Sequence, residues 1–455
     1  MNLLFRQPIS VFCIALALRA LVVFGFLRDM PFVSDAANYA AMAIGFLTAF
    51  PGEIAFFWPP GTALILLPWH MLFGDSPIVA QCVVLVFSSL AAALTVTVAR
   101  AVLGRESDLT WVGIAACFYP ASLLMAGQTY SQHFIAVPML LIAIVLIRYL
   151  NSPKATTALL LGLLLGVAVL VRPSALSVTA ALVPFLVWWN VSPRNGASRN
   201  GAIPGAVRDV VLLLLPVALL ATPVLLHNQK HDAGFSLSTN NEWNLFVGNN
   251  RYTPDYKTSH FGQRAPEDLP REIRKYLRAQ KGSLDREDRE RLKSTTIEFM
   301  KENPVRTIVR TWNRVKAFWG ADYIMSRQIQ NHFDLGSRGV IPLLVFEAGG
   351  YLLIACLALV GFFHARSEIA RAGLFALPLL ALAYQAPYSI AFSAGTYHYP
   401  VFFLLFPFAA VGFGEALRRR KPIPLTGKRL LACLVLLALF AALQIEYVWH
   451  TIKAT

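Results

Sequence analysis

The chain has 455 residues, of which 56% are hydrophobic and only 14% charged, and its mean hydropathy is +0.55. Soluble domains carry roughly 25% charged residues, so the composition excludes an ordinary soluble protein. A net charge of +15 would suggest nucleic acid as a partner of a soluble chain. Here the positions of the basic residues indicate membrane topology, and we expect a lipid bilayer and no nucleic acid as partner.

Eleven apolar segments reach about the 17 residues that a helix needs to cross a bilayer. They lie at 9–27, 77–99, 109–126, 132–148, 156–171, 174–190, 209–226, 341–363, 372–391, 397–417 and 430–448. We interpret the first as an uncleaved anchor, since its apolar run is too long for a signal peptide and no clean cleavage site follows. The shorter piece 60–73 is predicted to be a helix at, or dipping into, the outer leaflet. The sequence therefore predicts an all-α polytopic membrane protein with a single membrane domain, 1–455.

The basic residues of the short loops fall on one side when the segments alternate across the membrane. That side receives Arg100, Arg105, Arg148, Lys154, Arg194, Arg199, Arg208, Arg366, Arg371, Arg418, Arg419, Arg420, Lys421, Lys428 and Arg429. The opposite short loops, near 127–131 and 392–396, contain no Lys or Arg. Under the positive-inside rule the amino terminus is cytoplasmic.

Two regions are predicted to lie outside the membrane on the extracytoplasmic face. The first is 28–60, and the second is a long loop over 227–340, within which 285–302 has the pattern of an amphipathic helix ended by Asn303 and Pro304. The five cysteines lie in apolar segments, so neither a disulfide scaffold nor a zinc site is indicated. Arg19 lies inside the first segment, where a charge needs a partner or a polar cavity.

Polar residues from distant segments are predicted to meet at the outer boundary. They are Asp35, Tyr39, Glu53, Ser131, Gln132, His133, Arg172, His227, Asn228, Tyr397, His398 and Tyr399. Each has a structural alternative: Ser34 could cap a helix that begins at Asp35, Arg172 could extend to the headgroups, and His398 could be an interfacial residue. These residues are nevertheless predicted to lie at one depth on one side of the membrane. An active site for a lipid-linked substrate would lie at such a position.

A set of motifs in order along nearly the whole chain resembles the C-type (GT-C) superfamily of polytopic glycosyltransferases, in the branch with protein O-mannosyltransferases and aminoarabinose transferases. The motifs read SDAANYAAMA, FFWPPGTALILLPWHMLFG, GLLLGVAVLVRPSAL, NNEWNLFVGNN, IEFMKENPVRTIVRTWNRVKAFW and TYHYP. The resemblance implies a GT-C-like bundle with outer juxtamembrane helices, a mixed extracytoplasmic loop region, and a polyprenyl-phosphate sugar donor. Asp35 matches the catalytic aspartate of the family.

The resemblance also assigns binding roles. Arg172 matches the arginine of the family's Rp motif, and His398, beside Tyr397, matches a basic residue that meets the donor phosphate. Tyr39, Glu53, Gln132, His133 and Asn249 are possible substrate-binding residues. Three positions depart from the family pattern, namely Trp58 in place of a lysine, Gln132 in place of a glutamate and Thr396 in place of an arginine.

These residues predict an inverting transfer of a sugar to a glycan, lipid or protein acceptor on the outer face of the plasma membrane, with Asp35 as general base. Retaining chemistry would need a second, paired carboxylate. The sequence contains no tight cluster of acidic residues that would bind a metal, so we expect no obligatory metal cofactor. The alternatives are a lipid-linked-sugar flippase or transporter and a non-catalytic lipid-binding scaffold. The sugar, the acceptor and the polyprenol are not readable from the sequence.

Overall fold

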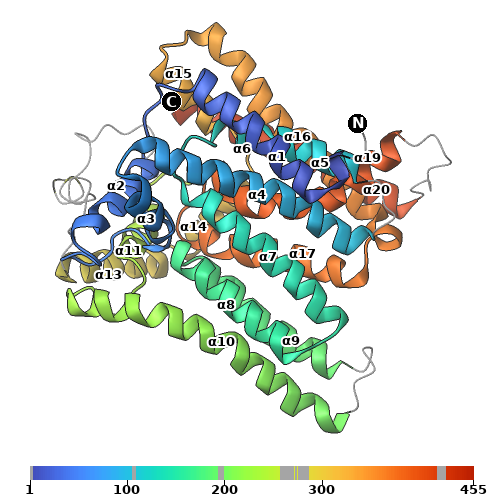
Figure 1. Cartoon of the computed structure of the whole chain (residues 1–455), viewed down its shortest axis with the longest axis horizontal. Coiled ribbons are helices and arrows are strands. Elements are labelled where there is room, and N and C mark those ends of the chain that lie inside the picture. The colour runs from blue at the N-terminus through green and yellow to red at the C-terminus, as the bar shows by residue number, and fades with distance from the viewer. Residues whose placement is uncertain are drawn as a thin grey trace.

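The computed structural model describes residues 4–104, 109–192, 199–256, 271, 274, 286–417 and 427–454, and these form helices and no strand. Figure 1 shows most of the long helices running side by side in one bundle. The α-helices are α1 Pro8–Ala20, α2 Asp35–Thr48, α3 Gly61–Phe73, α4 Pro77–Leu103, α5 Thr110–Phe118, α6 Pro120–Leu124, α7 Ser131–Asn151, α8 Ala155–Val171, α9 Ala175–Val191, α10 Arg199–Lys230, α11 Asn240–Gly248, α13 Arg286–Glu302, α14 Pro304–Phe318, α15 Ile324–His332, α16 Ser337–Glu368, α17 Arg371–Ile390, α18 Tyr399–Phe402, α19 Phe406–Leu417 and α20 Lys428–Ala454.

Eight helical segments of the described chain are long and apolar enough to cross a membrane. They are Pro8–Phe26, Pro77–Leu103, Ser131–Asn151, Ile203–Lys230, Ser337–Ala365, Arg371–Ile390, Gly395–Gly414 and Lys428–Thr451. The predicted segments 156–171 and 174–190 correspond to the shorter apolar helices α8 and α9. The prediction of an all-α polytopic membrane protein is therefore confirmed.

One end of the bundle gathers the amino terminus and several of the basic residues, and we call it the basic end. Arg100, near the end of α4, donates a hydrogen bond to the carbonyl of Arg6, and Arg6 donates to Thr110 at the start of α5. At the same end the indole of Trp189 donates to the Leu150 carbonyl. The predicted basic residues Arg105, Arg194 and Arg418–Lys421 lie outside the described residues.

We call the opposite end of the bundle the site end. It gathers five connections: the one that follows the first span, Pro8–Phe26, and those that follow α6, α8, α10 and α17. Helices α2, α3, α11 and α13 cluster there, at the left of Figure 1, opposite the amino terminus. Helix α3 has 13 residues and is about 20 Å long, too short to cross a hydrocarbon core of about 30 Å. It matches the short helix predicted over 60–73.

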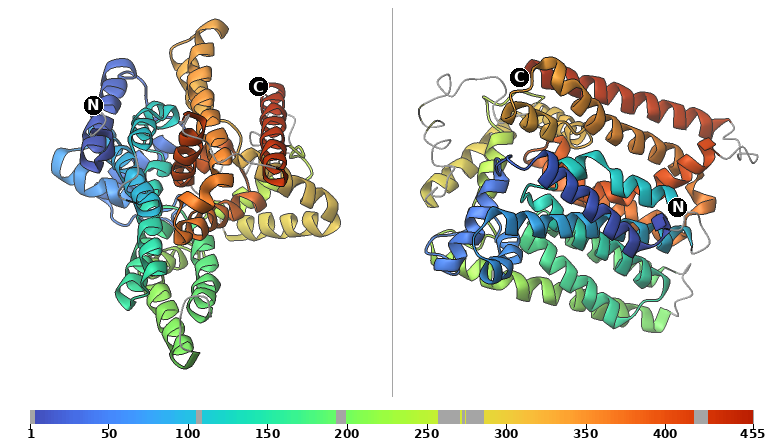
Figure 2. Two further views of the ribbon diagram at one scale, coloured as in Figure 1. Left: turned by 90° about the vertical axis from the view of Figure 1, so that its right-hand side faces the viewer. Right: turned by 45° about the horizontal axis from the view of Figure 1, so that its top comes forward.

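The long polar region is largely helical where the structure describes it. Helix α13, Arg286–Glu302, matches the amphipathic helix predicted over 285–302, and Pro304 begins α14 directly afterwards. Figure 2 shows this part of the chain, in yellow, lying across the bundle instead of along it. The loop therefore contributes further helices that extend over the site end.

The predicted span 109–126 is wrong as a single helix, because it is broken into α5 and α6 at Tyr119. Pro120 has no N–H, so the carbonyl of Ala116, four residues earlier, has no helical donor. Arg19 of α1 replaces that donor: its guanidinium lies 3.3 Å from the Ala116 oxygen and 3.4 Å from the Cys117 oxygen. The same side chain donates to the hydroxyl of Ser122 at 2.8 Å. Arg19 is thus a structural partner of the broken span.

Candidate functional site

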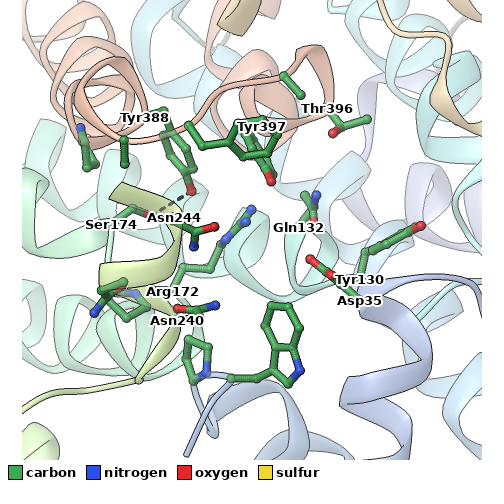
Figure 3. Close-up of a pocket in the computed structure, with 18 of the residues that line it drawn as sticks. Asp35, Tyr130, Gln132, Arg172, Ser174, Asn240, Asn244, Tyr388, Thr396 and Tyr397 are labelled. Atoms are coloured by element: carbon green, nitrogen blue, oxygen red, sulfur yellow. Dashed lines mark hydrogen bonds between the residues drawn. The ribbon is translucent and has the colours of Figure 1, made fainter. Parts of the chain in front are cut away.

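A cavity of about 760 Å³ lies at the site end of the bundle. It is lined by segments far apart in the sequence, and Figure 3 shows their side chains converging on it. The polar lining residues are Ser34, Asp35, Tyr39, Tyr130, Gln132, Arg172, Ser174, Asn240, Asn241, Asn244, Gln328, Tyr388, Thr396 and Tyr397. Asp35, Tyr39, Gln132, Arg172 and Tyr397, which the sequence singles out, are therefore brought together around one space.

Asp35 is the first residue of α2 and is half-buried at the cavity wall. Ser34, immediately before it, has φ of 54° and makes no capping hydrogen bond with its side chain. This left-handed conformation is strained for a residue other than glycine. The predicted helix start at Asp35 is confirmed, but the proposed cap by the Ser34 hydroxyl is wrong, because that hydroxyl does not reach the helix amides.

The environment of Asp35 favours a carboxyl group that accepts protons more readily than usual. Burial raises the pKa of Asp35 above its ordinary value, while the positive charge of Arg172 and the Ser34 hydroxyl act in the opposite direction. Burial also raises the pKa of Tyr39, one turn later on α2, to about 12. Tyr39 therefore stays neutral, and of these two side chains Asp35 is the one suited to take up a proton.

The segment before α2 is fastened to the connection between α6 and α7. The side-chain amide of Gln128 accepts a hydrogen bond from the Val33 N–H at 3.0 Å and donates to the Pro31 carbonyl at 3.0 Å. Thr129 donates to the carbonyl of Ala36 at 2.5 Å. Because Gln128 and Thr129 are buried, these bonds are shielded from water and hold the start of α2 in place.

Arg172 follows α8 and reaches the cavity between two aromatic rings. Its guanidinium carbon lies 5.6 Å from the centroid of the Tyr388 ring and 5.1 Å from that of the Tyr397 ring. Its buried Nη1 atom has no hydrogen-bond partner among the described residues. A desolvated cation with an open donor is suited to bind an anionic oxygen in the cavity.

Asparagines of α11 form another wall, which the sequence reasoning missed. Asn240, Asn241 and Asn244 line the cavity, and Asn240 and Asn244 share a helix face because they are four residues apart. The stretch NNEWNLFVGNN contains all of these asparagines, but the prediction based on the resemblance named only Asn249. Asn249 does not line the cavity: its amide donates to the carbonyls of Leu245 and Ile390.

Two arginines of α14 hold α11 and the turn that follows it. Arg314 donates to the carbonyls of Gly248 and Ile390 and to the side chain of Asn249, so it joins the ends of α11 and α17. Arg310 donates to the carbonyls of Asn250 and Thr253. Both arginines are buried, and they position the cavity wall without lining it.

His398, predicted to meet the donor phosphate, does not line the cavity and is fully buried. Its Nδ1 lies 2.7 Å from the Phe318 carbonyl, and its Nε2 lies 3.4 Å from the carboxylate of Asp322. Its ring stacks on Tyr351 with centroids 4.5 Å apart. The adjacent residue Tyr397 reaches the cavity instead, because successive residues of a helical turn point in different directions.

Two other candidates also lie away from the cavity. His133 is buried, with Nε2 3.0 Å from the Met125 carbonyl and Nδ1 in a 3.1 Å hydrogen bond with Tyr399. Glu53 is exposed in the loop that follows α2. By contrast Trp58, Gln132 and Thr396, the positions that depart from the family pattern, all line the cavity.

Within the described ranges no group of three or more His, Cys, Asp or Glu side chains is arranged to hold a metal ion. Among the described lining residues, only Asp35 and Arg172 carry a charge. Figure 3 shows Arg172 beside Asn240 and Asn244, and Asp35 across the cavity beside Tyr130 and Gln132. The arrangement separates one potential base from one potential anion site.

No protein-family model matches the chain, and no curated protein matches it. It is similar to solved structures of the oligosaccharyltransferase of Archaeoglobus fulgidus. The complex of that protein, AglB, with an inhibitory peptide and a dolichol-phosphate has a TM-score of 0.48 and 12% identity, over 98% of this chain and 56% of that one. A complex with Zn and sulfate has a TM-score of 0.49 and 13% identity, over 98% and 53%. The chain spans about half the length of these structures.

Proposed function

We propose that this protein is a membrane glycosyltransferase that moves a sugar from a polyprenyl-phosphate-linked donor to a hydroxyl acceptor. The observation that carries the proposal is the pairing of Asp35 and Arg172, the two charged residues of the described cavity lining, on facing walls. Transfer from a lipid phosphate needs a base for the acceptor and a cation for the leaving group. This cavity offers one of each.

Asp35 acts as general base in the proposed mechanism. Its carboxylate takes the proton from the acceptor hydroxyl, whose oxygen attacks the anomeric carbon. The bond between that carbon and the phosphate oxygen breaks, and its electron pair leaves with the polyprenyl phosphate. Since the described lining supplies one carboxylate, a single displacement with inversion needs fewer groups than a retaining mechanism, which uses two.

Arg172 stabilises the leaving phosphate. Negative charge grows on the phosphate as the glycosidic bond breaks, and a fixed guanidinium in a partly desolvated site stabilises that charge more than water does. The rings of Tyr388 and Tyr397 fix the guanidinium without neutralising it. The proposal assigns no resident metal, because a single carboxylate is a poor divalent-cation site.

The proposal puts the cavity on the extracytoplasmic face of the plasma membrane, with the amino terminus in the cytoplasm. Its support is the basic end of the bundle, where Arg6, Arg100, Arg148 and Arg371 lie near helix termini. Short loops rich in Lys and Arg remain in the cytoplasm. A donor anchored by its polyprenyl tail would then present its sugar at the site end.

The test is sugar release from a polyprenyl-phosphate-linked donor by the purified full-length protein, with and without Asp35→Asn. We expect the variant to keep donor binding and to lose turnover by about 100-fold or more, as for removal of a general base. Asp29→Asn, an exposed position outside the cavity, is the matched control and should keep full turnover.

Three results would count against the proposal. Full turnover by Asp35→Asn would remove Asp35 from the role of base. Donor binding without turnover in the parent protein, across glycan, lipid and peptide acceptors, would favour a lipid-binding scaffold. Movement of the intact donor between leaflets, unaffected by Asp35→Asn, would favour a flippase.

A further inference from the structure

The cavity has a wall whose chemistry the proposed reaction does not use. The base and the phosphate site account for Asp35 and Arg172, and every other described residue of the lining is uncharged at neutral pH. Close to Arg172, where the donor's first sugar would follow its phosphate, the wall includes the side-chain amides of Asn240 and Asn244 from α11. This wall bears on which sugar the donor carries.

The amides of the wall have unused hydrogen-bonding groups. Asn244 makes no side-chain hydrogen bond with a described residue, and Asn240 accepts one at 3.0 Å from the Ser238 hydroxyl while its NH₂ donates none to a described residue. Asn240 is largely buried and lines the cavity, so a ligand in the cavity can reach its open donor. An asparagine amide offers both a donor and an acceptor, as a sugar hydroxyl does.

The element that presents these amides is fixed at both ends. Before α11, the Thr239 N–H donates to the Phe56 carbonyl at 2.9 Å. After it, Arg314 binds the Gly248 carbonyl and the Asn249 side chain. A side chain binds its ligand most effectively when surrounding contacts such as these hold its backbone in place.

We infer that the transferred sugar is a neutral, polyhydroxylated residue, recognised through its hydroxyl groups by Asn240 and Asn244. This inference rests on the proposed function. A sugar with a free amino or carboxyl group would enter a partly desolvated space where no described side chain remains to pair its charge, and burying an unpaired charge is costly. Amides on a rigid helix instead select for hydroxyl positions, because each missing hydroxyl leaves a polar group unpaired.

The experiment measures donor affinity without turnover, in full-length Asp35→Asn protein. The ligands are polyprenyl phosphate alone and the same lipid phosphate carrying a neutral hexose, an amino sugar or a uronic acid. We expect the neutral hexose to bind more tightly than the bare lipid phosphate. Asn244→Ala should remove roughly fivefold or more of that gain while leaving the bare lipid phosphate unchanged.

Two further variants separate recognition from structure. Asn331→Ala, at an exposed position of α15 outside the cavity, is the matched control and should change no affinity. Asn244→Asp keeps the size of the side chain and introduces a negative charge, so it should weaken the neutral donor and strengthen the amino-sugar donor. A purely structural role of Asn244 would not produce this exchange of preference.

The outcomes distinguish this inference from the proposed function. Tighter binding of the amino sugar or the uronic acid than of the neutral hexose would overturn the inference and leave the transferase standing. The same holds if Asn244→Ala changes the bare lipid phosphate as much as the neutral donor. Failure of the parent protein to bind any lipid phosphate would overturn the proposed function, and the inference with it.

Discussion

The guanidinium of Arg172 lies over the ring of Tyr397, 5.1 Å from its centroid, although the two residues belong to segments far apart in the chain. The ring restricts the arginine side chain and leaves its Nη1 without a protein partner among the described residues. An ion pair in the same place would have consumed the donor that a phosphate needs. The contact therefore orients a cation while leaving it available.

Substitution of Tyr397 should reveal this role. Tyr397→Phe keeps the ring face and should keep the affinity for polyprenyl phosphate within about twofold, whereas Tyr397→Leu removes a cation–π contact of about 0.5–2 kcal/mol and should weaken binding several-fold. Equilibrium binding of polyprenyl phosphate to the purified protein measures both. Equal affinities for the two variants would contradict the role of the ring.

The pH profile should report the state of Asp35. A general base is active when deprotonated, so kcat/KM should fall tenfold per pH unit below the pKa of Asp35. Burial raises that pKa, and the charge of Arg172 opposes the rise. The acid limb should therefore lie above the range of an ordinary aspartate and move to still higher pH in Arg172→Gln. A limb that stays in place in this variant would argue against coupling between the two residues.

The sequence predicted the crossing helices well because their signal is local. Runs of apolar residues mark segments that must satisfy their backbone hydrogen bonds inside a membrane, and this constraint does not depend on distant contacts. The site was predicted less completely, since its side chains meet only after folding. Motifs located the segments around Arg172, Tyr397 and Asn249, but they did not say which face of each helix reaches the cavity.

The wrong predictions concern contacts that form only after folding. His398 was predicted, together with Tyr397, to meet the donor phosphate because a basic residue suits a phosphate, yet the histidine turns towards Phe318 and Asp322. Asn249 was predicted within NNEWNLFVGNN, whereas the cavity-lining amide that makes no hydrogen bond with a described residue is that of Asn244. The break of the span at Tyr119 was missed, because the donor that replaces the missing N–H is Arg19 of another helix.

Gly248 should tolerate no side chain. A Cβ at this position would lie 1.7 Å from the carbonyl oxygen of Ala391. Gly248→Ala must therefore push α11 away from the end of α17. Residues of both helices line the cavity. We expect a loss of about 1–3 kcal/mol in stability and weaker donor binding. Gly45→Ala, where a Cβ meets nothing within 4 Å, should be neutral or slightly stabilising. Thermal unfolding in detergent compares the two, and equal effects would contradict the tight packing.

Arg19 should matter for stability and not for chemistry. Arg19→Met leaves the carbonyls of Ala116 and Cys117 without their buried donor, which should cost about 2–4 kcal/mol. The exposed Arg28 provides the control, since Arg28→Met should change stability by less than about 0.5 kcal/mol. Unfolding in mixed micelles gives both values. A stable Arg19→Met protein with no turnover would instead indicate a role for Arg19 in the reaction.

The two ends of the bundle should lie on opposite sides of the membrane. A reporter that is active only in the cytoplasm, inserted after Ser152 between α7 and α8, should be active, because this loop is at the basic end with Arg148 and Lys154. The same reporter inserted after Gly234, between α10 and α11, should be silent, because α10 returns the chain to the site end, where the His227 ring nitrogen lies 3.0 Å from the Ile54 carbonyl. Activity at both positions would mean that the three helices between them, α8, α9 and α10, do not all cross the membrane, and the reversed pattern would place the cavity in the cytoplasm.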